Sequence, residues 1–252
     1  MSKGTPLVLA YHAVSERWQH PLAVSEEQMF RHLRLLLSLR YRPARTDEIL
    51  SRRGRLMHVS FDDAYTSVAR VLSGLAKLGV PATVFACSGY ADTGAPLAVP
   101  ELVDEVAAHP SELKTMNWDA LRELTERGVE VGSHTVSHPH VTELSDTELE
   151  RELVDSRRQL EDELGRPCRY FSYPYGEQDA RVRFAARAAG YQAAFALPGI
   201  DRPPDPFAFP RIGIYQRDNI ARAALKTSPL RRPALALAGI RKRPIKPLIG
   251  GH

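Results

Sequence analysis

The sequence predicts an α/β fold with a mostly parallel sheet in a single catalytic domain. Apolar segments of strand length alternate along the chain with segments that carry apolar residues at helical spacing, and this alternation is typical of strand–helix units around a parallel sheet. About seven such units fit into the chain, which is long enough to bury a sizeable core. The alternation alone leaves open whether the sheet closes into a barrel or stays open and doubly wound, because both folds use the same unit.

Strands are expected where apolar residues run together between turn residues. The expected strands are 7–12, 56–61, 81–86, a short strand that starts at 129 and runs into two histidines, 169–173, 191–197 and 207–215.

Helices are expected where a capping residue precedes apolar residues at helical spacing. Ser25 and Ser145 each open a capping box, which pairs the serine with a Gln or Glu three residues later. The expected helices are one from Ser25, a single turn at 46–50, 67–78, one from Asn117 to Gly128, one from Ser145 to Leu164, 181–189 and one capped by Asp218. Residues 91–111 are rich in small residues and proline and are expected to form a long loop, of a length that often carries function.

Two adjacent acids, Asp62 and Asp63, follow the apolar segment 56–61. The carboxyl ends of strands are where barrel and open α/β folds carry their chemistry. Adjacent residues on a strand point to opposite sides, so two acids that share one site imply a bend and two different tasks, such as holding a metal and accepting a proton. A solvated strand end that caps the next helix is the alternative for an isolated pair.

His134 and His138 follow another short strand and lie four residues apart. Imidazole is a common ligand of zinc-like ions, and two rings at this spacing can reach one ion. Two histidines and one carboxylate leave coordination positions open for water and substrate, which is typical of a catalytic rather than a structural metal site. The spacing is weak evidence alone and becomes strong beside the acids of an earlier strand end.

Together these motifs resemble the polysaccharide deacetylase family (carbohydrate esterase family 4, with a NodB-like domain). That family carries Phe-Asp-Asp, His-Ser/Thr-x-x-His and a motif around Pro-Tyr-Gly, which here read Phe61–Asp63, His134–His138 and Tyr173–Gly176. The resemblance covers roughly residues 7–215 and implies an irregular (β/α)7-type barrel of mostly parallel strands. On this basis we expect a catalytic domain over 1–220 and a basic, proline-rich tail over 221–252.

The resemblance also implies a role for each motif residue. In this family the second acid and both histidines bind a divalent metal, which here means Asp63, His134 and His138, with Zn²⁺ as the expected ion. Asp62 would be the general base that takes a proton from the attacking water. The backbone N–H of Tyr175 would donate to the oxyanion.

The sequence departs from the family pattern in two places. Most members supply a catalytic acid from a late Leu-x-His motif, but the only histidine after residue 176 is His252. His12 is the candidate acid instead, in a Tyr-His segment similar to that of the branch that includes poly-N-acetylglucosamine deacetylases; a capping or buried structural histidine is the alternative. Ser172 stands where the third motif has an arginine that orients the catalytic acid. Arg211 is the candidate to place a guanidinium beside Asp62, against an ordinary surface arginine.

Composition is that of a soluble globular protein, with 43% apolar and 25% charged residues. The net charge of +4 is uneven, because residues 221–252 hold eight Lys or Arg and no acid. This tail predicts contact with an anionic surface such as a membrane and no specific nucleic acid, and a solvated, partly disordered tail is the alternative. The apolar segment in residues 1–12 is too short for a signal peptide, so a cytoplasmic location is expected. This expectation includes a peripheral position of the protein at the inner face of the membrane. Cys87 and Cys168 are expected to be core thiols and not a disulfide.

The motifs predict a metal-dependent hydrolase that removes an N-acetyl group from an amino sugar or glycan intermediate. A cytoplasmic enzyme does not meet finished cell wall, so a nucleotide-linked, lipid-linked or small glycoside is the expected substrate. A hydrolase of a non-sugar C–N amide bond and a non-catalytic carbohydrate-binding relative stay open as alternatives. Five histidines have no assigned role, although the last could line the cleft: His20, His32, His58, His109 and His140.

Overall fold

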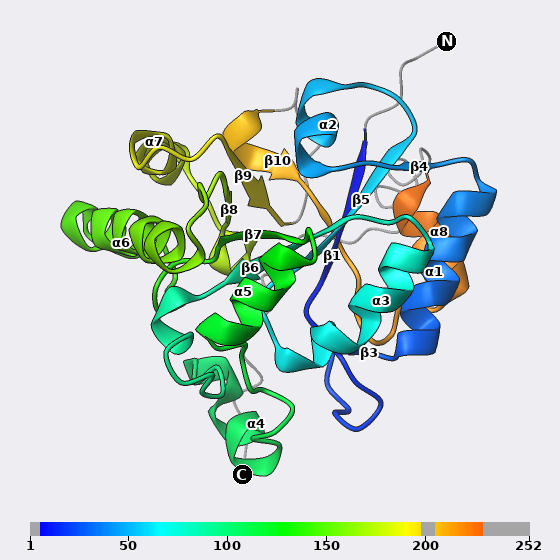
Figure 1. The fold of residues 1–252 in the computed structure, drawn as a ribbon, viewed down its shortest axis with the longest axis horizontal. Coiled ribbons are helices and arrows are strands. Elements are labelled where there is room, and N and C mark those ends of the chain that lie inside the picture. The colour runs from blue at the N-terminus through cyan, green and yellow to red at the C-terminus, as the bar shows by residue number, and fades with distance from the viewer. Residues whose placement is uncertain (1–5, 198–204, 229–252) are drawn as a thin grey trace, which may run out of the picture.

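A parallel sheet curls into a barrel at the centre of the molecule (Figure 1). The computed structural model describes residues 6–197 and 205–228. The main sheet orders its strands β10-β9-β8-β7-β6-β5-β1-β11, with β4 beside β5, and neighbouring strands are parallel. Its strands are β1 (Leu7–Tyr11), β4 (Arg42–Pro43), β5 (Leu56–Phe61), β6 (Ala82–Ala86), β7 (Glu130–Ser133), β8 (Tyr170–Ser172), β9 (Ala193–Ala196), β10 (Phe209–Pro210) and β11 (Ile212–Gly213). A small second sheet pairs β2 (Ala13–Val14) with β3 (Ala23–Val24).

The two ends of the main sheet meet at one residue. β10 ends at Pro210 and pairs with β9, whereas β11 begins at Ile212 and pairs with β1. Only Arg211 separates them, so β10 and β11 are two halves of one strand that joins both ends of the sheet. With β1 and β5 to β9 this strand completes a ring of seven, and the predicted (β/α)7-type barrel is confirmed. The prediction of one continuous strand over 207–215 is wrong. Residues Pro206–Ala208 form a 3-10 helix, and Pro210 lacks the backbone N–H that an unbroken strand ladder needs.

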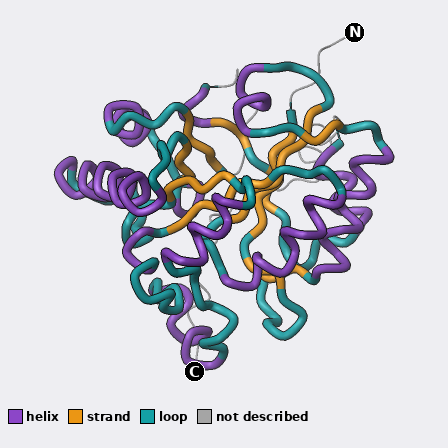
Figure 2. Tube along the Cα trace, viewed as in Figure 1, coloured by secondary structure: helices purple, strands orange, loops and turns teal. Residues whose placement is uncertain are grey.

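Helices surround the strands (Figure 2). They are α1 (Glu26–Ser38), α2 (Thr46–Ser51), α3 (Ala69–Lys77), α4 (Val103–Ala108), α5 (Trp118–Glu126), α6 (Asp146–Leu164), α7 (Ala180–Ala188) and α8 (Ile220–Thr227). The predicted caps of α1 and α6 are present: the Ser25 side chain accepts the N–H of Gln28, and Ser145 and Glu148 form a full capping box. Gly165 ends α6 in the left-handed conformation that glycine adopts at little cost.

Two predicted details are wrong. Residues 91–111 are not a plain loop, because they contain a 3-10 turn at Pro100–Leu102 followed by α4. Leu102 is buried in a cluster with Trp18, and this anchor orders the segment. The cap of α8 is Asn219, whose side chain accepts the N–H of Arg222. Asp218 instead accepts the N–H of Tyr215 and pairs with Lys226.

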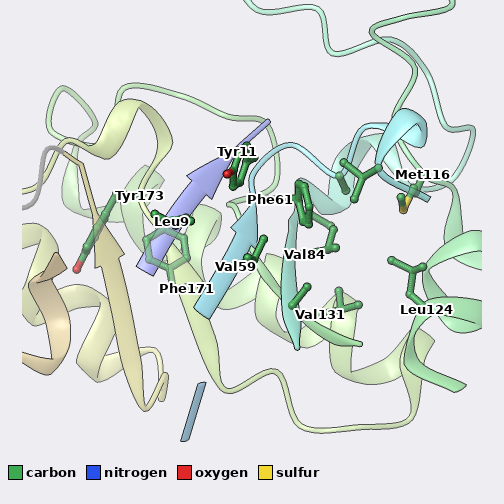
Figure 3. Close-up of a cluster of buried hydrophobic side chains, with 14 of the residues drawn as sticks. Leu9, Tyr11, Val59, Phe61, Val84, Met116, Leu124, Val131, Phe171 and Tyr173 are labelled. Atoms are coloured by element: carbon green, nitrogen blue, oxygen red, sulfur yellow. The ribbon is translucent and has the colours of Figure 1, made fainter. Parts of the chain in front are cut away.

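Apolar side chains fill the barrel and the space beneath its helices (Figure 3). Every residue of β5 is buried, as expected for a strand of a parallel sheet that is covered on both faces. Leu9 and Tyr11 of β1, Val59 and Phe61 of β5 and Val84 of β6 lie in this core. The core therefore holds the carboxyl ends of these strands in fixed positions.

Helix α8 packs against α1, so the ordered chain continues past residue 220, and residues 229–252 of the predicted tail lie outside the described residues. Within 6–197 and 205–228, no helix combines the length and apolarity that crossing a membrane requires. Cys87 and Cys168 are both buried free thiols, as predicted.

His58 on β5 is a buried histidine with a structural role. Its ring bonds the carbonyl of Ala44 (2.9 Å) and the hydroxyls of Thr83 (2.9 Å) and Thr46 (3.3 Å). Burial lowers the pKa of His58 to about 4. The unfolded chain, with an ordinary histidine pKa, therefore binds more protons than the folded chain between the two values. Stability is fully present above the unfolded pKa and falls as the pH drops from about 6.5 toward 4.

We expect His58 to account for a loss of roughly 2–3 kcal/mol in the free energy of unfolding between pH 7.5 and pH 4.5. The free energy of unfolding is measured with urea at both pH values for the wild type and for His58→Gln. The contribution of His58 is the loss between the two pH values in the wild type minus the loss in His58→Gln. His109→Gln, at an exposed histidine, is the control and should lose as much as the wild type. Equal losses in the wild type and His58→Gln would contradict the assignment.

Candidate active site

The predicted site residues converge at the carboxyl ends of the barrel strands. Asp62 and Asp63 follow β5, His134 follows β7, and Arg211 lies between β10 and β11. His12 follows β1. Because these strands are parallel, the four residues that follow a strand lie at the same end of the barrel. Arg211 lies between the two halves of the last strand and reaches Asp62 with its guanidinium.

Asp63, His134 and His138 form a buried cluster. Asp63 Oδ1 lies 3.5 Å from His134 Nε2 and 3.4 Å from His138 Nε2. One ligand atom from each residue lies within 4.8 Å of the others. Asp63 Oδ1 is buried without a hydrogen-bond partner among the described residues. A buried carboxylate oxygen in this position is one that a cation would satisfy.

The state of His134 also suits metal binding. Its Nδ1 lies 2.7 Å from the carbonyl oxygen of Ser172, which can only accept, so the hydrogen is assigned to Nδ1 and the Nε2 lone pair faces Asp63. Burial lowers the pKa of His134 to about 4, so the ring is neutral at pH 7. Two imidazole rings and one carboxylate with open positions fit a zinc-type ion. The three residues predicted as ligands are thus together.

Asp62 and Arg211 form a fully buried ion pair. Arg211 Nη1 donates to Asp62 Oδ1 (2.7 Å) and Nη2 donates to Oδ2 (2.8 Å). Arg211 is 1% exposed, so the alternative of a surface arginine is wrong and the predicted contact is present. Ser172 joins the pair, since its hydroxyl accepts from Arg211 (2.7 Å) and lies 3.2 Å from Asp62. Ser172, which stands where the family's third motif has an arginine, therefore contacts the guanidinium of Arg211, which comes from another strand.

Arg211 decides the ionisation of Asp62. Burial by itself would raise the pKa of Asp62, but Arg211, followed by His134 and His12, lowers it well below its usual range. Asp62 is therefore a carboxylate at every physiological pH. His12 is close enough to act on Asp62, its ring stacks on Tyr215 (6.3 Å, 23°), and its Nδ1 is buried without a partner among the described residues. Its role as the acid stays a prediction.

Tyr175 lies on the other side of His138, in a cluster that the sequence did not predict. We call Tyr175, His140, Glu101 and Glu177 the Tyr175 cluster. The ring of Tyr175 contacts His138 edge to face (4.7 Å, 71°) and stacks on His140 (3.9 Å, 7°). Burial would lower the pKa of His140, but its hydrogen bonds to the carboxylates of Glu177 and Glu101 raise it. Only the position of His140 near the second motif hinted at this neighbourhood in the sequence.

A model of the polysaccharide deacetylase family matches residues 51–194. The chain belongs to the polysaccharide deacetylase family. The resemblance seen in the three motifs is thereby confirmed. The match begins just before β5 and ends in β9, so it contains both acids, both histidines and Tyr175, whereas His12 and Arg211 lie outside it.

Individual polysaccharide deacetylases are distant in sequence. YxkH of Bacillus subtilis (strain 168), named as a candidate polysaccharide deacetylase, is 22% identical over 193 residues, or 73% of this chain. The chain spans 62% of the length of YxkH.

Solved structures share the fold over most of this chain. IcaB from Ammonifex degensii is 23% identical with a TM-score of 0.73, over 89% of this chain and 98% of IcaB. A de-N-acetylase from Aggregatibacter actinomycetemcomitans is 22% identical with a TM-score of 0.71, over 88% of this chain and 99% of the other. A polysaccharide deacetylase from Bacillus cereus is 20% identical with a TM-score of 0.70, over 88% and 69%. At this identity the likeness shows a common fold.

Backbone strain is concentrated at the candidate site. Six described residues other than glycine have positive φ, and five of them lie in the three motif segments or directly after one: Asp63 (67°), Ala64 (48°), Thr135 (72°), His138 (62°) and Tyr175 (56°). This conformation costs an L-residue roughly 1–2 kcal/mol. Strain that persists in a folded chain is often stored where side chains must be aimed at a ligand or substrate.

Proposed function

We propose that the chain is a metal-dependent hydrolase that removes the acetyl group from an N-acetylated amino sugar. The observation that carries this proposal is the pairing of two buried units, the Asp63–His134–His138 cluster and the Asp62–Arg211 ion pair. Both acids follow β5 directly, so one unit can hold a metal while the other accepts a proton beside it. Zn²⁺ is the proposed ion, because three N and O ligands with open positions are typical of catalytic zinc.

Asp63, His134 and His138 would hold the ion, which when bound lowers the pKa of water and polarises a carbonyl. Asp62 would accept the proton of the attacking water. Arg211 keeps this carboxylate ionised and fixes both of its oxygens, so the base is charged and oriented before substrate arrives.

His12 and Tyr175 would serve the remaining steps. The ring of His12 would donate a proton to the departing amine, since it lies near Asp62 and keeps an unpartnered buried nitrogen. The backbone N–H of Tyr175 would donate to the oxyanion of the tetrahedral intermediate. Base, acid and oxyanion donor then come from three different strand ends.

The proposed substrate is a nucleotide-linked, lipid-linked or small N-acetylated glycoside in the cytoplasm. The eight basic residues of 221–252 support contact with an anionic membrane face, where lipid-linked sugars are found. IcaB and the Aggregatibacter de-N-acetylase share the fold, which makes acetylated amino sugars the first compounds to test.

Acetate release tests the proposal. The purified full chain is assayed on a panel of free, nucleotide-linked and lipid-linked N-acetyl amino sugars, the last in anionic vesicles, with metal content measured alongside. We expect about one metal per chain, release from at least one sugar, loss of release on chelation and recovery with Zn²⁺. Preferential release in vesicles would support membrane contact.

Two outcomes would contradict the proposal. Bound metal with hydrolysis of ureides or formamides but of no sugar would favour a non-sugar amide hydrolase. Absence of both metal and release would favour a carbohydrate-binding relative.

A further inference from the structure

Tyr175 adopts a backbone conformation that its own sequence does not favour. Its φ of 56° and ψ of 3° lie in the left-handed region, and Gly176 follows with φ 72°. Gly176 packs so closely on the end of β9 that an added Cβ would lie 2.2 Å from the Leu197 carbonyl oxygen. Gly176 therefore fits the turn without strain, whereas Tyr175 must be held there by contacts of its side chain.

The Tyr175 side chain is fixed by two partners from other segments. Its hydroxyl donates to Glu101 Oε2 (2.8 Å), which comes from the 3-10 turn before α4. Its ring lies flat on the ring of His140 at 3.9 Å. The same ring also contacts the edge of His138, so Tyr175 lies directly beside a proposed metal ligand.

His140 is itself fixed from both sides. One ring nitrogen lies 3.2 Å from Glu101 Oε1 and the other lies 3.0 Å from Glu177 Oε2. One carboxylate oxygen of Glu101 therefore contacts the His140 ring that stacks on Tyr175. The other oxygen accepts the hydrogen bond of the Tyr175 hydroxyl. Glu177 lies two residues after Tyr175, so one of the two carboxylates that hold His140 comes from the turn that contains Tyr175.

We propose that His140 and Glu101 are positioning residues that hold Tyr175 in its left-handed conformation beside His138. They touch no reacting atom. Their effect on turnover rests on the proposed function, in which the Tyr175 N–H meets the oxyanion, but their effect on the conformation of the turn does not.

Hydrogen exchange tests the conformational part without any substrate. The amides of Gly176 and Glu177 donate to the carbonyls of Tyr173 (2.9 Å) and Pro174 (3.2 Å), so their exchange reports how often the turn opens. In His140→Ala we expect these amides to exchange at least about tenfold faster than in wild type. His140→Phe keeps a ring for the stack and should give a smaller increase. His109→Ala, at an exposed histidine, is the control and should leave exchange unchanged.

Kinetics test the consequence for catalysis. We expect His140→Ala to lower kcat about 10- to 100-fold, less than complete removal of an oxyanion donor, with KM within about threefold and metal content unchanged. Tyr175→Phe removes the hydroxyl that donates to Glu101, and Glu101→Ala removes this acceptor together with the contact to His140. The double variant should therefore lose no more kcat than Glu101→Ala alone.

Each outcome decides one part. Unchanged exchange in His140→Ala would overturn the positioning role. Faster exchange with unchanged kcat would overturn its relevance to turnover, as would additive losses in the double variant. Faster exchange in a protein whose wild type releases no acetate would support the positioning role and count against the proposed function.

Discussion

Asp62→Asn is expected to reduce kcat for acetate release by about a thousandfold or more, because general-base catalysis contributes about 10²- to 10⁴-fold and asparagine cannot accept the proton. The side chain keeps its shape and can still receive one hydrogen bond from Arg211. Asp63, His134 and His138 are untouched, so metal content should stay at the wild-type value. Steady-state kinetics and metal analysis of the same preparation measure both.

Asp119→Asn is the matched control for this substitution, because Asp119 is an exposed aspartate on α5. It should retain wild-type kcat and metal content. Retained metal in Asp62→Asn would also show that the barrel end is folded, since the proposed ligands follow two different strands. A kcat within tenfold of the wild type would exclude Asp62 as the general base.

Arg211→Met is expected to lower the free energy of unfolding by about 3–5 kcal/mol, because it leaves the Asp62 carboxylate buried without its counter-ion. Methionine replaces much of the volume, so loss of the charge dominates the effect. Turnover should fall as well, since Asp62 loses the two hydrogen bonds that orient it. Denaturant unfolding and kcat at neutral pH measure the two effects.

Arg211→Lys separates charge from geometry. Lysine keeps a positive charge but cannot make the two parallel bonds of a guanidinium, so it should recover part of the stability and less of the turnover. Arg217→Met, at an exposed arginine, is the control and should change neither quantity. Full turnover in Arg211→Met would show that Asp62 needs no partner.

Much of the site could be predicted from the sequence because each motif follows a strand of a parallel sheet. The adjacent acids Asp62 and Asp63 lie far from His134 in the chain, yet the parallel strands that precede them bring all three to one end of the barrel. Arg211 could be nominated by its charge alone. Its contact with Asp62 depends on Pro210, which divides the last strand and lets the chain cross between β9 and β1.

The rest of the neighbourhood depends on tertiary packing that local patterns do not encode. Glu101 sits in a segment that reads as a loop, and only burial of Leu102 beside Trp18 orders the turn that carries it. His140 gains its carboxylate partners from two other segments. The positive φ of Tyr175 is likewise imposed by contacts, since tyrosine does not favour it by itself.

Arg211 is the residue at which the two ends of the main sheet meet, and its guanidinium binds Asp62 on β5. The strand that closes the ring therefore also carries the counter-ion of a buried acid. A chain without this strand would hold Asp62 without its partner, and burial would then favour the protonated acid. The proposed base is therefore held as a charged, oriented carboxylate only when the last strand is in place.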